Sequence, residues 1–158
     1  MTGERAPRDA ALIRPAQPGD AATIRDLVVA AYASYAQQVG RVPGPMRDDY
    51  ERRVAACEVW VLERGGEIAG VIVLKDEPDG LMIDNVAVRP EAQGNGFGRA
   101  LLAFAEREAR RRGYGAVRLY ANVIMVKNIA IYERLGFVEV ERFRDGASTR
   151  IQMAKLVG

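Results

Sequence analysis

The chain has 158 residues, a formal net charge of +2, 49% hydrophobic residues and 28% charged residues. These values are typical of one folded domain of ordinary size, and a net charge this small gives no electrostatic reason to expect a nucleic-acid or membrane partner. The sequence contains no histidine and a single cysteine, Cys57. Ser-His-Asp and Cys-His catalysis, histidine-ligated zinc and an intrachain disulfide are therefore excluded.

The N-terminal segment Met1–Ala10 is polar and charged and lacks the apolar stretch of a signal peptide. No run in the sequence approaches the ~20 apolar residues that a membrane span needs. We expect a flexible tail over residues 1–10 and a single domain over residues 11–158. A lone cysteine fits the reducing conditions of the cytoplasm.

The first half of the sequence predicts a strand, two helices and three further strands. Leu12–Arg14 predicts the first strand, and Asp20 is placed to cap a helix from Ala21 to about Gln38, in which apolar residues recur at helical spacing. The glycines and prolines of Gly40–Pro45 predict a loop, and Arg47–Ala56 predicts a second short helix. Apolar β runs then predict a three-stranded antiparallel meander, formed by Val59–Leu62, Ile68–Leu74 and Leu81–Val88.

The second half predicts a helix from Arg99 to about Arg112, ended by Gly113, and a strand at Val117–Tyr120. This strand should lie parallel to Leu81–Val88, because a strand–helix–strand unit in one sheet forms a right-handed parallel crossover. A short helix at Lys127–Leu135 and a final hairpin follow, the hairpin strands being Phe137–Phe143 and Thr149–Leu156.

The segment between Val86 and Leu102 carries the strongest functional signal. Gly94, Gly96 and Gly98 alternate with other residues directly before a predicted helix. A helix N-terminus offers unpaired backbone N–H groups and a partial positive charge, and glycines allow a phosphate to approach the backbone closely. The segment therefore favours a pyrophosphate site, although such glycines can also do no more than turn the chain.

Three kinds of nucleotide site place glycines directly before a helix. A P-loop requires Gly-Lys-Ser/Thr, which Phe97, Gly98 and Arg99 do not supply. A dinucleotide fingerprint requires a last glycine where Arg99 stands, and an acidic residue near Ala116, where there is none. The pyrophosphate of coenzyme A is the remaining interpretation.

Two blocks of the sequence resemble the GNAT superfamily of N-acetyltransferases. The first runs from Val86-Ala87-Val88 through Pro90 to Leu101-Leu102, and its core Gln/Arg-x-x-Gly-x-Gly/Ala is matched by Gln93, Gly96 and Gly98. The second is Asn128-Ile129-Ala130-Ile131-Tyr132 followed by Leu135-Gly136-Phe137. The resemblance covers the chain well from about Val59 onward. It implies a mixed α/β (α+β) fold, with a mostly antiparallel sheet of about six or seven strands, splayed at the parallel pair and flanked by about four helices.

The resemblance also implies a set of site residues. The backbone of Val86 and Val88, with Ala87 between them, would pair with the pantetheine arm of acetyl-coenzyme A, and Asn128 would contact this co-substrate near its pantetheine or its phosphates. Tyr132 would face the thioester sulfur. The residues that would hold the pyrophosphate are Gln93, Gly94, Asn95, Gly96, Phe97, Gly98 and Arg99.

Acetyl transfer to an amine requires removal of a proton from the ammonium and protonation of the thiolate that leaves. Tyr132 suits the second task, because a phenol with a reference pKa of about 10 stays protonated at neutral pH. Asp84 shares a strand face with Val86 and Val88, so its carboxylate can take the amine proton, bind a cationic substrate or bond to the backbone. No credible nucleophile is present, so direct transfer in a ternary complex is expected, and no metal is required.

The acceptor is expected to be a primary amine of a small molecule or peptide. A homodimer is compatible with the sequence. Two other functions are alternatives to catalysis. An acyl-coenzyme A sensor would bind the co-substrate without forming product, and a nucleic-acid-binding domain is disfavoured by the scattered arginines and the near-neutral charge.

Overall fold

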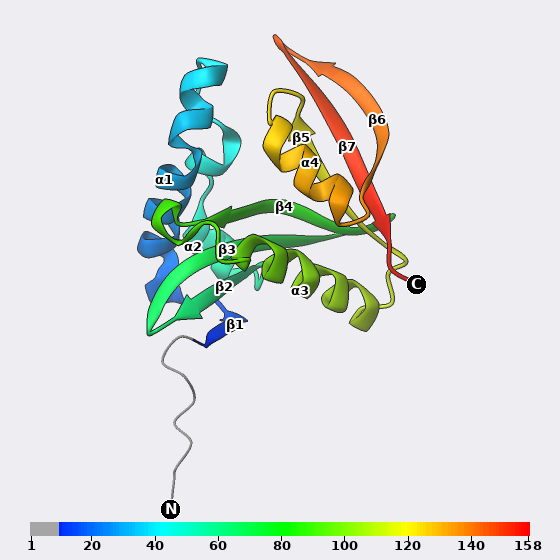
Figure 1. Cartoon of the computed structure of the whole chain (residues 1–158). Helices are drawn as coiled ribbons and strands as arrows, with labels where there is room; N and C mark the ends of the chain where they lie inside the picture. The colour runs from blue at the N-terminus through cyan, green and yellow to red at the C-terminus, as the bar shows by residue number, and fades with distance from the viewer. Residues whose placement is uncertain (1–9) are drawn as a thin grey trace, which may run out of the picture. The chain divides into compact units, whose positions relative to one another are not determined.

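A computed structural model describes residues 10–158, so the expectation of a tail over residues 1–10 lies almost entirely outside the described residues. Seven strands form one sheet in the order β1-β2-β3-β4-β5-β7-β6 (Figure 1). Their bounds are Ala11–Pro15, Val59–Arg64, Glu67–Glu77, Gly80–Val88, Ala116–Asn122, Val138–Asp145 and Ser148–Leu156 for β1 to β7. Helices α1 to α4 cover Ala21–Val39, Tyr50–Ala55, Phe97–Arg111 and Val126–Arg134.

The sheet is mixed, as the sequence predicts. The pairs β1–β2, β2–β3, β5–β7 and β6–β7 are antiparallel, and β4–β5 is parallel. The parallel ladder is short, because it runs only from Leu81↔Val117 to Ile83↔Leu119.

The chain divides into two compact units. The described part of the first comprises residues 10–73 and 85–102. Its core forms where the apolar stripe of α1 packs with β2, β3 and Ala87 of β4, as the helical spacing predicts. Of the predicted stripe, Ile24, Leu27 and Val28 are buried together with Ala21, whereas Ala31 and Tyr35 are half-buried.

The second unit comprises residues 74–84 and 103–158. Its core includes the alternate residues Val117, Leu119 and Ala121 of β5, which are all buried. Leu119 and Ala121 lie opposite Met153 and Ile151 of β7 in the antiparallel ladder, so one face of these two strands is apolar.

Three details of the sequence prediction are wrong. Helix α2 begins at Tyr50 rather than Arg47, because the carboxylate of Asp49 accepts a hydrogen bond from the Arg52 N–H at 3.1 Å and caps the helix there. Asp20 occupies the N-cap position of α1 but does not cap it with its side chain, since it binds Arg14 at 2.8 Å instead. Helix α3 begins two residues before Arg99, at Phe97.

Candidate active site

The loop between β4 and α3 contains two glycines with left-handed backbone. Gly94 has φ +86° and Gly96 has φ +78°, a conformation that other residues rarely adopt. A Cβ atom at either position would meet no protein atom within 4 Å. The glycines are therefore required by the backbone rather than by packing, and the space beside them is open to a ligand.

Helix α3 starts directly after this loop. Its first backbone hydrogen bond runs from the Ala100 N–H to the Gly96 carbonyl at 3.0 Å, so the N–H groups of the preceding residues in the helix have no partner within it. Phe97 and Gly98 belong to this first turn, together with the exposed Arg99. An anion is favoured at this position by the donors and by the helix dipole.

Side chains of the loop bond to the chain itself. The Gln93 Nε2 donates to the Val88 carbonyl at 3.2 Å, and the Asn95 Nδ2 donates to the Ala92 carbonyl at 2.9 Å. The Phe97 ring is buried, and the Arg64 guanidinium lies 5.5 Å from its centroid. Gln93, Asn95 and Phe97 therefore brace the loop, and its backbone is the part offered to a ligand.

Strand β4 presents alternate residues to opposite faces of the sheet. Asp84 is exposed and Val86 and Val88 are half-buried, whereas Ala87 is buried in the core formed with α1. Asp84 therefore shares a face with the two valines, as predicted.

Tyr132 lies on α4, one helical turn after Asn128, and both side chains are half-buried. Burial raises the pKa of Tyr132 to about 12. Its hydroxyl forms no hydrogen bond with any group in residues 10–158, so its donor is available to a ligand. The Tyr132 ring packs edge-on against Phe137, with centroids 6.0 Å apart.

A buried polar network on β4 was missed by the sequence reasoning. Tyr32 of α1 donates to the Asn85 Oδ1 at 2.7 Å, and the Asn85 Nδ2 donates to the Tyr50 hydroxyl at 3.2 Å. Tyr50, in turn, donates to the Pro45 carbonyl at 2.5 Å. One signal in the sequence could have revealed this network. Side chains alternate along β4, so Asn85 points to the same side as the buried Ala87, and a buried amide needs hydrogen-bond partners.

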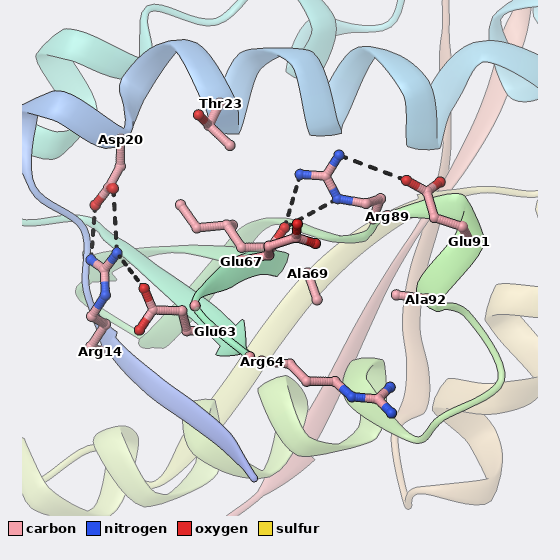
Figure 2. A pocket seen from close by; sticks show the side chains of 13 residues that line it. Arg14, Asp20, Thr23, Glu63, Arg64, Glu67, Ala69, Arg89, Glu91 and Ala92 are labelled. Atoms are coloured by element: carbon pink, nitrogen blue, oxygen red, sulfur yellow. Dashed lines mark hydrogen bonds and ion pairs between the residues drawn. The ribbon is translucent and has the colours of Figure 1, made fainter. Parts of the chain in front are cut away.

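An open cavity of about 750 Å³ lies in the first unit, and Figure 2 shows its charged lining. Arg14 contacts Asp20 at 2.8 Å and Glu63 at 3.3 Å, and the hydrogen bond from Arg14 lowers the pKa of Asp20. Arg89 donates to the Ile68 carbonyl at 2.9 Å. None of the predicted site residues lines this cavity.

Within residues 10–158, no group of three His, Cys, Asp or Glu side chains could hold a metal ion. In the same residues, no helix is both long enough and apolar enough to cross a membrane.

Comparison with curated proteins gives two kinds of relative. A mycothiol acetyltransferase of Streptomyces bingchenggensis is 38% identical over 52% of this chain and 27% of its own length. The [ribosomal protein bS18]-alanine N-acetyltransferase of Escherichia coli K12 is 35% identical over 49% of this chain and 53% of its own length. The match with each relative thus spans at most about half of that protein.

Solved structures share the fold over almost the whole chain. The ribosomal-protein-S18-alanine N-acetyltransferase of E. coli has a TM-score of 0.75 and 24% identity, with 94% of each chain covered. The PaiA N-acetyltransferase of Thermoplasma acidophilum, solved with coenzyme A, has a TM-score of 0.79 and 18% identity, covering 93% of this chain and 99% of its own. Residues 21–137, most of the chain and both motif blocks, match the acetyltransferase (GNAT) family. This chain belongs to the GNAT family of acetyltransferases.

Proposed function

We propose that this chain is an N-acetyltransferase that transfers the acetyl group of acetyl-coenzyme A to a primary amine of a small molecule or peptide. The observation that carries the proposal is the loop before α3, where left-handed Gly94 and Gly96 open onto the unpaired N–H groups of a helix start. Backbone donors and a positive helix end suit a diphosphate, which coenzyme A contains. The coenzyme A complex of the T. acidophilum relative supports this choice of ligand.

The residues that would bind the co-substrate have distinct tasks. The loop Gln93–Arg99 would bind the diphosphate oxygens through backbone N–H groups. The backbone of β4 at Val86–Val88 would bond the amides of the pantetheine arm as an added strand does. Asn128 would add an amide contact to the same molecule.

Tyr132 would donate the proton that the departing thiolate takes up. Two observations support this role: the raised pKa keeps the phenol protonated at neutral pH, and its hydroxyl has no hydrogen-bond partner in the described part of the chain. Asp84 would accept the proton of the substrate ammonium, directly or through water. The backbone N–H of Val86 would stabilise the oxyanion of the tetrahedral intermediate.

Attack by the amine itself, in a ternary complex, fits this set of residues. The lone cysteine, Cys57, follows α2 and has no histidine to activate it anywhere in the sequence. A ping-pong route through an acetylated enzyme therefore has no evident nucleophile. We also infer a cytoplasmic location from the use of one unpaired cysteine.

The test is thiol release from acetyl-coenzyme A over a panel of amines, with binding measured separately by calorimetry. The panel includes a peptide with N-terminal alanine, because one relative is named for that acceptor. We expect heat of binding in the absence of amine, and thiol release above the no-amine background with at least one acceptor. Binding with no release for any amine would support the sensor function instead, and the absence of binding would contradict both.

A further inference from the structure

The end of helix α4 is connected to α3 and β7 through one lysine. Resting on the proposed function, which gives Tyr132 the role of proton donor, we propose that Lys155 is a positioning residue for Tyr132. Its ammonium is held by Glu106, and its carbon chain packs on Gly136, so that together they fix the C-terminal turn of α4. All of these residues belong to the second compact unit.

The ion pair at one end of this arrangement is largely removed from solvent. The Lys155 Nζ lies 2.5 Å from the Glu106 Oε1, and the two side chains are 28% and 17% exposed. Within the described residues this Glu106 oxygen is buried and has no hydrogen-bond partner, so the ammonium is what compensates its charge. Loss of the lysine would leave a carboxylate oxygen buried without compensation.

The carbon chain of Lys155 passes directly over Gly136. A Cβ atom on Gly136 would stand 3.2 Å from the Lys155 Cε, which is tighter than ordinary van der Waals contact, and 3.6 Å from its Cδ, which is an ordinary contact. Gly136 also has φ +99°, in the region that favours glycine. The glycine thus allows both the turn and the passage of the lysine, and the lysine in turn limits where that turn can lie.

The same turn holds Tyr132 from two sides. The Gly136 N–H donates to the Glu133 carbonyl and the Phe137 N–H donates to the Tyr132 carbonyl, both at 3.0 Å. The buried Phe137 ring lies edge-on to the Tyr132 ring. Because no protein group in residues 10–158 bonds to the Tyr132 hydroxyl, packing alone sets its position. A displacement of about 1 Å is enough to slow a positioned proton transfer substantially.

The first test is a double-mutant cycle on kcat that combines Lys155→Met with Tyr132→Phe. Lys155→Met keeps an unbranched apolar side chain and removes the charge. We expect it to lower kcat by about tenfold and leave the KM for acetyl-coenzyme A within about twofold. In the Tyr132→Phe background, the same change should lower kcat by less than about twofold.

Two further variants separate positioning from general damage to the fold. Glu106→Gln retains the shape of the partner and should lower kcat in the same direction as Lys155→Met. Arg111→Met is the matched control, because it breaks an ion pair of α3 with Glu108 on the surface, and it should leave kcat unchanged. Equal losses of kcat from Lys155→Met in both tyrosine backgrounds would overturn the proposal.

A second readout does not depend on activity. Protein labelled with 3-fluorotyrosine gives fluorine resonances, among which Tyr132 is identified as the signal absent from Tyr132→Phe. We expect Lys155→Met and Glu106→Gln to shift that resonance and Arg111→Met to leave it in place; an unshifted resonance would overturn the proposal. If Tyr132→Phe retains the wild-type rate, this inference fails while acetyl transfer stands. If the wild-type protein releases no thiol, the proposed function fails, and the resonance still decides whether Lys155 positions Tyr132.

Discussion

The loop that begins α3 and the turn that ends α4 are held in place by different means. The loop depends on backbone conformation, with Gly94 and Gly96 in the left-handed region and short local hydrogen bonds from Gln93 and Asn95. The end of α4 depends on side chains distant in sequence, among which Lys155 reaches back to α3. Ligand binding by a backbone loop of this sort should tolerate side-chain substitutions in the loop. The position of a side chain at the end of α4, in contrast, should respond to substitutions far from the reacting atoms.

The largest expected effect is that of Tyr132→Phe on kcat. Removal of the hydroxyl should lower kcat at least tenfold, towards the ~100-fold that a general acid typically contributes, with acetyl-coenzyme A affinity little changed. Steady-state kinetics and calorimetry measure the two quantities. Tyr35→Phe is the control, because Tyr35 also packs edge-on against another ring, at 6.1 Å. A wild-type kcat for Tyr132→Phe would show that Tyr132 is not the proton donor.

Next in size is the effect of Gly96→Ala on binding. The methyl group would strain a backbone at φ +78° and project into the open space beside the loop. We expect the Kd of acetyl-coenzyme A to rise about tenfold and the free energy of unfolding to fall by about 1–2 kcal/mol.

Gly113→Ala is the matched control for that change. Gly113 has φ +83° and equally open surroundings, but it follows the other end of α3. Its unfolding free energy should fall by a similar amount while the Kd stays within about twofold. Equal changes of Kd in the two variants would show that the loop is not the binding site.

A third prediction concerns the stability of the protein at alkaline pH. Burial raises the pKa of Tyr132 from 10.0 to about 12, so between these values the unfolded chain releases the proton that the folded chain keeps. Stability contributed by this group is therefore complete below pH 10 and is lost as pH rises towards 12. From pH 9 to pH 11, wild type should lose about 1.3 kcal/mol more unfolding free energy than Tyr132→Phe, as measured with urea. Equal losses of unfolding free energy in the two proteins would show that the Tyr132 phenol is exposed to solvent.

The difference between the two regions also explains what the sequence could predict. The alternating glycines identified the loop, because left-handed turns and helix starts leave local signals. The stripe of α1 and the parallel β4–β5 pair were predicted for the same reason, since periodicity and connectivity are local or nearly so. The Lys155–Glu106 pair and the Tyr32–Asn85–Tyr50 network carry no such signal, because their partners meet only in the folded chain.

Helix boundaries show the same limit on a smaller scale. Asp20 has the residue type and position of a helix cap, but Arg14 takes its carboxylate. Asp49 performs that function for α2 instead and moves its start to Tyr50. Competition between partners for one carboxylate depends on tertiary structure, which residue preferences alone do not contain.

The smallest expected effect is that of Asn95→Ala, which tests whether side chains of the loop matter as little as its construction suggests. The change removes the exposed hydrogen bond from the Asn95 Nδ2 to the Ala92 carbonyl, worth about 0.5–1 kcal/mol, and leaves both left-handed glycines intact. The Kd of acetyl-coenzyme A should rise only about two- to fivefold by calorimetry, below the effect of Gly96→Ala. An effect as large as that of Gly96→Ala would mean that the Asn95 side chain, rather than the backbone, binds the ligand. The loop, like the end of α4, would then depend on side chains.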